Sequence, residues 1–158
     1  MKKFLLFLLG IYIGLVVFMP KDNLYYTFQK YLKKENIYIN SSISQDLIKL
    51  SLKNAKVYSN NINIADFENI NIYPLILFNL ISVKNLKLEI GNYKISNLNI
   101  YFTPFYPIGL IKGDSSFGKV DGEINLMKRY IKVYIQKPST ISSFLKKDKK
   151  GYFYYAKF

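Results

Sequence analysis

The stretch LKLEIGNYKISNLNIYF, residues 86–102, alternates apolar and polar side chains on both sides of the dipeptide Gly91-Asn92. A period of two sends successive side chains to opposite faces of a β-strand, and Gly-Asn is a common two-residue turn. The stretch therefore predicts a β-hairpin with one apolar face and one face rich in Lys and Asn. This pattern is typical of an antiparallel sheet that is covered on one side.

The same alternation extends outward from the hairpin over most of the chain. It predicts further strands in residues 37–39, 48–53, 62–64, 70–72, 120–126, 131–135 and 152–158. Two apolar runs, residues 74–81 and 139–147, begin at or after a proline and are predicted to form short helices. The predicted fold class is α+β, mainly β: a mostly antiparallel sheet with a few short helices, formed as one domain by residues 37–158.

The alternation gathers a set of apolar side chains on one face of this sheet. Either a second layer seals the face as a core, or the face stays open as a groove that lipid can reach. Sealing it would stabilise the domain by about 25 cal/mol per Å², so an open face needs another cover. The candidate residues for groove or core are Ile48, Leu50, Leu52, Leu86, Leu88, Ile131, Val133 and Ile135.

Residues 1–20 are predicted to be a transmembrane anchor. No charge lies between Lys3 and Lys21, and this run gives about 25 Å of helix, near the short end of the spanning range. A cleavable signal peptide is the rival interpretation, but residues 19–22 offer no small-residue cleavage site. The anchor is represented by Phe4, Leu9, Gly10, Gly14 and Val17. Its two glycines have the spacing of a helix-packing motif, which is compatible with a homo-oligomer.

The charges that flank the anchor give two answers about its orientation. Lys2 and Lys3 favour a cytoplasmic amino terminus under the positive-inside rule, whereas the lysines after the anchor favour the reverse. The layout mimics a signal sequence, which favours the first answer. We therefore expect a single-pass protein of the bacterial inner membrane with its carboxyl-terminal domain in the periplasm.

Residues 21–36 are predicted to form an amphipathic juxtamembrane helix. Aromatic residues recur at helical spacing, and lysines take other positions. The helix either lies on the lipid headgroups or packs on the following sheet. The residues of this predicted juxtamembrane face are Tyr25, Phe28, Tyr31, Lys30, Lys33 and Lys34.

Composition argues against catalysis. The chain has no Cys and no His, so it lacks a thiol nucleophile and the commonest general base and metal ligand. The acidic pairs Asp66/Glu68 and Asp121/Glu123 are better explained as solvated strand positions than as catalytic carboxylates. We expect a protein that is not an enzyme, with no catalytic residue, cofactor or metal. The net charge of +13 comes almost wholly from Lys, which makes a specific nucleic-acid partner unlikely.

Residues 69–88 are predicted to be a strand, a proline-led helix and a strand, and this unit resembles the repeat of AsmA-like envelope proteins and of type II secretion system protein N. The later stretches 118–126 and 131–135 are similar to the closing strands of those proteins, as is the ending through Phe144-Leu145 and Gly151-Tyr-Phe. The resemblance implies an inner-membrane anchor and a curved periplasmic sheet, and it brings no catalytic residue.

Two functions from different classes follow. The first is a non-enzymatic scaffold in a trans-envelope machine for secretion, pilus or flagellar assembly, with the membrane and other machine subunits as partners. The second is an AsmA-like module that binds or transfers lipid. The first predicts that machine subunits co-purify with the protein, and the second predicts that acyl chains do.

Overall fold

The computed structural model describes residues 2–89, 93–136, 138 and 145–157. Two helices come first, α1 (Lys2–Phe18) and α2 (Lys21–Lys34). Strands make up the rest: β1 (Ile37–Gln45), β2 (Leu50–Ser59), β3 (Ile62–Pro74), β4 (Asn79–Leu88), β5 (Tyr93–Thr103), β6 (Tyr106–Ser115), β7 (Gly118–Asn125), β8 (Tyr130–Ile135), β9 (Lys146–Asp148) and β10 (Gly151–Lys157). The mainly β fold class is confirmed.

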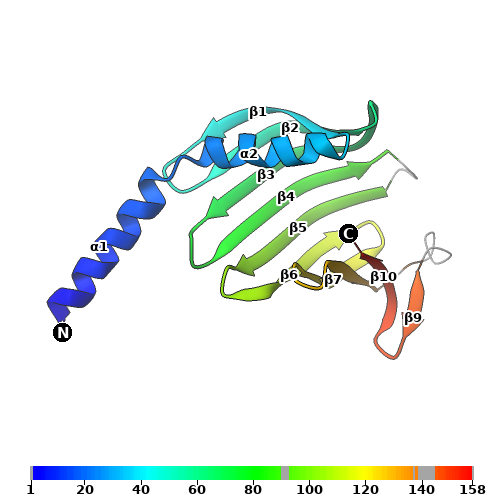
Figure 1. Ribbon diagram of the computed structural model, residues 1–158. Coiled ribbons are helices and arrows are strands. Elements are labelled where there is room, and N and C mark those ends of the chain that lie inside the picture. The colour runs from blue at the N-terminus through cyan, green and yellow to red at the C-terminus, as the bar shows by residue number, and fades with distance from the viewer. Residues whose placement is uncertain (1, 90–92, 137, 139–144, 158) are drawn as a thin grey trace.

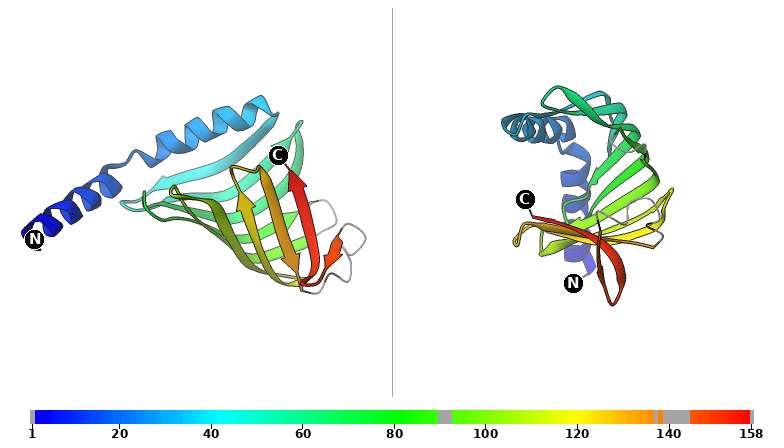
Figure 2. Two further views of the ribbon diagram at one scale, coloured as in Figure 1. Left: turned by 60° about the horizontal axis from the view of Figure 1, so that its bottom comes forward. Right: turned by 90° about the vertical axis from the view of Figure 1, so that its right-hand side faces the viewer.

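The strands form one open antiparallel sheet in the order β1-β2-β3-β4-β5-β6-β7-β8-β10-β9. Each strand from β1 to β8 pairs with the next along the chain, and β10 lies between β8 and β9. The sheet is strongly curved, and α2 lies inside the curve near β1 (Figures 1 and 2). Helix α1 projects away from one end of the strands (Figure 1).

The pairing register keeps one face of the sheet apolar across the strands. Leu52 lies opposite Ile70, Ile70 opposite Val83, and Val83 opposite Leu98. Further along, Ile111 pairs with Gly122, Gly122 with Val133, and Val133 with Tyr154. Because residues that face each other in a sheet share a side, these apolar residues form one surface on the inside of the curve. This surface is called the concave apolar face below.

In four neighbouring strands, the two-residue alternation of side chains is interrupted at positions that lie side by side across the sheet. In β2, β3, β4 and β5, inward-facing apolar residues are three positions apart instead of two, as with Leu52 and Ala55 or Val83 and Leu86. The extra residues are exposed, and two of them, Asn54 and Asn85, have a positive φ. An extra residue of this kind bends a strand and increases its twist. This line of extra residues thus keeps the apolar residues on one face while the sheet bends.

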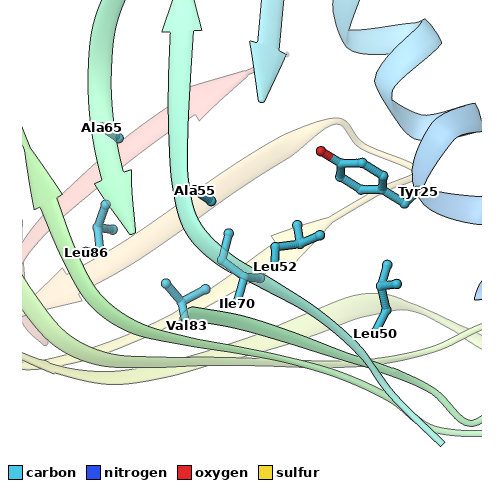
Figure 3. Packing of buried hydrophobic residues seen from close by; sticks show 8 residues of the cluster. All are labelled: Tyr25, Leu50, Leu52, Ala55, Ala65, Ile70, Val83 and Leu86. Atoms are coloured by element: carbon cyan, nitrogen blue, oxygen red, sulfur yellow. The ribbon is translucent and has the colours of Figure 1, made fainter. Parts of the chain in front are cut away.

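Helix α2 covers the β1 end of the concave apolar face. Its Tyr25 packs against Leu50 and Leu52, and Figure 3 shows the ring directed toward the side chains of the sheet. The Gln29 side-chain amide donates to the carbonyl oxygen of Ile39 at 2.5 Å, and the Tyr25 hydroxyl donates to the same oxygen at 3.4 Å. Since β1 is an edge strand, these bonds tie the helix to a backbone group on the sheet edge.

The structure corrects the prediction of a helix in residues 74–81. Pro74 ends β3, Asn79 begins β4, and Pro74 and Asn79 face each other in the ladder. The apolar run between them is a tight turn in which Ile76 has a φ of 65°. Eight residues nucleate a helix poorly, whereas strand pairing on both sides supplies the ladder hydrogen bonds.

Two other predictions fall partly or wholly on residues that the structure does not describe. Most of the predicted helix 139–147 lies outside the described residues, and its last two residues, Lys146 and Lys147, begin β9. The predicted Gly91-Asn92 turn also lies outside them. Its flanking strands are present as β4 and β5, which pair as predicted.

Neither described helix is by itself long and apolar enough to cross a bilayer; α1 and α2 pass such a test only together, as a pair bent by 58°.

Candidate functional site: a partly covered apolar face

The concave apolar face is most extensively buried near its β1 end. The buried cluster there combines Tyr25 of α2 with side chains of β2, β3 and β4, of which Leu50 and Leu52 are each 2 % exposed. Its members are Tyr25, Leu50, Leu52, Ala55, Ala65, Ile70, Val83 and Leu86 (Figure 3). This part of the face is an ordinary sealed core, and Leu50→Ala here would create a cavity costing about 2–5 kcal/mol.

A second, smaller cluster lies at the other side of the face. It consists of Phe117, Val120 and Ile135, with Tyr93 and Val133 packed against it. Ring contact between Tyr93 and Phe117, 6.0 Å apart and edge to face, extends this cluster to β5. Ile95 packs against both clusters, and a further stretch of the concave apolar face belongs to neither of them.

That further stretch is half-buried around Ile111, which faces Ile100 and is 4 % exposed, and in the described part of the chain neither cluster includes it. It comprises Ile100 and Phe102 of β5, Ile124 of β7 and Ile131 of β8. Ile124 and Ile131 face each other beside the β7–β8 turn, and Phe102 lies one residue before the end of β5. The open stretch, defined by these residues, thus lies at the end of the sheet from which α1 projects.

Glycines on β6 and β7 let the backbone curve tightly next to the open stretch. A Cβ atom at Gly122 would lie 2.5 Å from the carbonyl oxygen of Lys132 and 2.9 Å from the Cα of Val133. A Cβ at Gly113 would collide with the carbonyl oxygen of Asn97. Larger residues at these positions would force the strands apart. The glycines therefore allow a close approach of the neighbouring strands, whose Leu98 and Val133 side chains lie beside Gly113 and Gly122.

The predicted groove-or-core residues differ in burial: some are buried in a cluster, some are half-buried and one is exposed. Leu50, Leu52 and Leu86 belong to the sealed cluster, and Ile135 to the second cluster. Leu88, Ile131 and Val133 are half-buried on the concave face. Ile48 is exposed in the turn before β2 and lies on neither cluster. Leu88 and Val133 pack against the two clusters, whereas Ile131 packs against neither.

The predicted juxtamembrane face is also divided. Tyr25 is buried against the sheet, whereas Phe28 and Tyr31 are exposed on the outer side of α2 together with Leu24. Lys30, Lys33 and Lys34 are exposed, and Lys34 lies 5.4 Å from the centre of the Tyr31 ring. The helix predicted for residues 21–36 is present as α2, and it packs on the sheet through one side chain of the predicted set.

The predicted anchor residues lie on a helix that is exposed along its first half. Phe4 and Leu9 are exposed, and nothing lies within 4 Å of a Cβ built at Gly10 or Gly14. Val17 is half-buried beside the β1–β2 turn. The buried amine of Lys21 donates to the carbonyl oxygens of Val16, Val17 and Met19 at 3.0, 3.4 and 3.2 Å. A cation at these carboxyl-terminal carbonyls is favourable, and it holds the bend between α1 and α2.

The convex side of β8 and β10 carries a cluster of rings and charges. The Lys132 amine lies 4.2 Å from the centre of the Phe153 ring and 3.1 Å from the Asp148 carboxylate. Hydrogen bonding to Tyr134 and pairing with Asp148 raise the pKa of Lys132. Nearby, the Tyr130 hydroxyl donates to Glu123 at 2.7 Å, which raises the pKa of Tyr130. These contacts fasten neighbouring strands and bring no nucleophile and base together.

The acidic pairs singled out in the sequence are spread over the convex side. Asp66 accepts a hydrogen bond from Asn63 at 2.9 Å, and Glu68 accepts one from Asn85. Asp121 is exposed, and Glu123 is engaged by Tyr130. Within the described residues no three His, Cys, Asp or Glu side chains are placed to hold a metal ion.

A row of exposed apolar side chains at turns was missed by the sequence reasoning. Leu77 and Phe78 in the β3–β4 turn, Phe105 in the β5–β6 turn and Met127 in the β7–β8 turn are all exposed. The sequence did contain a signal for these residues. In two of these turns, apolar residues follow a proline at positions where turns usually carry polar residues.

Comparison with protein-family models, with curated proteins and with solved structures finds no match to this chain.

Proposed function

We propose that the protein is a membrane-anchored module whose concave apolar face binds acyl chains of lipids. The observation that carries the proposal is the open stretch: the apolar face continues in register beyond the part that α2 covers, and Ile100, Phe102, Ile124 and Ile131 are left half-buried. A lipid chain is an apolar ligand without directional demands, so a curved aliphatic and aromatic surface suits it.

The energetic argument rests on the area left open. Apolar surface withdrawn from water contributes about 25 cal/mol per Å², or about 0.8 kcal/mol for each buried CH₂ group. A chain lying along the open stretch would gain this contribution for each methylene it buries. It would also complete the cover that α2 begins at the β1 end.

The proposed anchor is α1, with residues 1–20 in the bacterial inner membrane and the sheet in the periplasm. Its first half presents apolar side chains such as Leu5, Leu6 and Phe7 to the surroundings. In water these would form a large exposed apolar patch, which is unusual for a soluble monomer. Lys2 and Lys3 precede the apolar run and favour retention of the amino terminus on the cytoplasmic side.

The proposal is tested by binding of a fluorescent anthroyloxy fatty acid to the full chain in detergent micelles. We expect saturable binding that Ile100→Asp weakens by about tenfold or more, since about 1.4 kcal/mol is enough for that change. The matched control is Leu110→Asp, because Leu110 is exposed on the convex side of the neighbouring strand. Equal binding by both variants, with circular dichroism unchanged, would count against the concave face as the site.

A scaffold in a trans-envelope machine is the second candidate function. The ring cluster on the convex side of β8 and β10 favours it, because tyrosines are enriched at protein interfaces. Tyr155 is exposed on this side, and Lys132 lies over the Phe153 ring. This candidate predicts that Tyr155→Ala releases a co-purified subunit while fatty-acid binding is unchanged.

A further inference from the structure

The turns at the two ends of the strands differ in polarity. Four turns lie at the end from which α1 projects: β1–β2 (residues 46–49), β3–β4 (75–78), β5–β6 (104–105) and β7–β8 (126–129). They are called the α1-side turns (Figure 2). Their exposed apolar side chains include Leu47 at 69 %, Phe78 at 68 %, Phe105 at 77 % and Met127 at 79 % exposure.

The described turns at the opposite end are polar. Asn60-Asn61 joins β2 to β3, Lys149-Lys150 joins β9 to β10, and in the β6–β7 turn Ser116 is exposed while Phe117 is folded inward. Large apolar side chains that are exposed at that end include Ile62, beside the Asn60-Asn61 turn, and Tyr31, near the end of α2. Solvent-facing turns are normally polar. The exposed apolar side chains of the α1-side turns therefore indicate that another apolar surface covers them.

The position of α1 indicates what covers them. The Tyr12 hydroxyl, in the middle of α1, donates to the carbonyl oxygen of Leu75 in the β3–β4 turn at 2.8 Å. Tyr12 precedes the end of α1 at Phe18 by six residues, which corresponds to about 9 Å along a helix. Along the axis of α1, the β3–β4 turn therefore lies beside the apolar middle of the helix and not beside its carboxyl-terminal end.

We infer that the α1-side turns dip into the same bilayer leaflet that holds the carboxyl-terminal half of α1. The occupant is the lipid bilayer, because the Tyr12–Leu75 hydrogen bond holds the β3–β4 turn, with its exposed Phe78, beside the exposed apolar side chains of α1. This inference rests on the proposed anchor.

The charges at this end agree with a lipid surface. Lys128 and Arg129 follow Met127 in the β7–β8 turn and are exposed, whereas Lys49 pairs with Asp46 inside the β1–β2 turn at 3.3 Å. Basic residues next to an inserted apolar turn can contact anionic headgroups, at about 1 kcal/mol each. Insertion at this end also sets the open stretch of Phe102, Ile124 and Ile131 against the leaflet, so that acyl chains reach the concave face directly from the membrane.

The inference is tested with single tryptophans, since the natural chain has none. Phe78→Trp and Phe105→Trp report on the α1-side turns, Phe7→Trp on the anchor, and Ser116→Trp on the polar end. Each full-length variant is reconstituted in vesicles of phosphatidylcholine and phosphatidylglycerol that contain lipids labelled with doxyl groups on their acyl chains, and quenching is measured.

We expect the anchor and both turn probes to be quenched and shifted to shorter emission wavelength, and the Ser116→Trp probe to be unaffected. Quenching of Phe7→Trp without quenching of either turn probe would overturn the inference and leave the anchor intact. Absence of quenching at Phe7→Trp would overturn the anchor and the inference together. Quenching of Ser116→Trp equal to that of the turn probes would also overturn it, because the domain would then lie flat on the bilayer.

Discussion

The hydroxyl of Tyr12 donates a 2.8 Å hydrogen bond to the carbonyl oxygen of Leu75, across 63 positions of the chain. The donor belongs to α1 and the acceptor to the β3–β4 turn, so this bond links the helix to the sheet directly. A further link passes through α2, whose first turn contacts β1 through a bond from the Asp22 backbone amide to the Gln45 side-chain oxygen at 3.1 Å.

Removing this link is expected to loosen the helix from the sheet without changing the core. Tyr12→Phe should reduce the free energy of unfolding by about 1 kcal/mol, the usual contribution of one hydrogen bond, measured by urea titration in detergent micelles. Tyr26→Phe is the control, since the Tyr26 side chain is exposed on α2. A loss no larger for Tyr12→Phe than for Tyr26→Phe would mean that the bond does not stabilise the native arrangement.

The line of extra residues across β2 to β5 gives a second prediction. Asn85 has a φ of 49° and its side-chain amide donates to Glu68 on β3. Asn85→Ala should destabilise the domain by about 1–2 kcal/mol, because Ala tolerates a positive φ less well than Asn and the bond to Glu68 is lost. Asn85→Gly should recover part of the loss by relieving the strain, whereas Lys84→Ala at the neighbouring exposed position should change little. Equal stabilities of the Ala and Gly variants would contradict the strain argument.

Much of the fold follows from the sequence pattern because strand alternation is local information. The hairpin of residues 86–102 and the helix of residues 21–36 were predictable for that reason. The line of extra residues through Asn54 and Asn85 could not be predicted in this way. Each extra residue breaks the two-residue period of its own strand, and its role becomes clear only when it is seen next to the extra residue of the neighbouring strand. The helix predicted at 74–81 was wrong for a related reason, since the pairing of Pro74 with Asn79 is set by the whole ladder.

The site was less predictable than the fold. Sequence alternation placed Leu50, Leu88 and Val133 on one face, but how much of that face α2 covers depends on the curvature of the sheet and on Tyr25. The α1-side turns were missed because the alternation argument assigns no role to turn residues such as Phe78 and Phe105. Their shared position at one end appears only once the antiparallel order of the strands is known.

A third prediction concerns pH and the short strand β9, which has three residues. The Asp148 carboxylate accepts hydrogen bonds from the Lys150 amide at 2.8 Å, the Tyr134 hydroxyl at 2.9 Å and the Lys132 amine at 3.1 Å. Partial desolvation raises the pKa of Asp148, but these bonds outweigh it and the pKa lies below its ordinary value.

A carboxyl group whose pKa is lowered by folding stabilises the folded state above the pKa of the unfolded chain, about 3.9 for Asp. That contribution is lost as the pH falls through the lower folded pKa. We therefore expect β9 to detach below about pH 4, seen as smaller protection factors for amide exchange in residues 151–153, and Asp148→Asn to show the same effect at neutral pH. Asp121→Asn, on an exposed carboxylate, is the control. Protection factors that stay the same between neutrality and pH values below about 4 would contradict the role of Asp148.

The most direct test of acyl-chain binding is a photocrosslinking experiment in intact membranes. A benzophenone amino acid replaces Ile124 or Phe102 on the open stretch, or Leu110 on the convex side, in the full-length protein, and adducts are identified by mass spectrometry after irradiation. We predict phospholipid adducts at Ile124 and Phe102 and none at Leu110. Protein adducts in place of lipid at Ile124 and Phe102, or lipid adducts equally abundant at Leu110, would contradict the account.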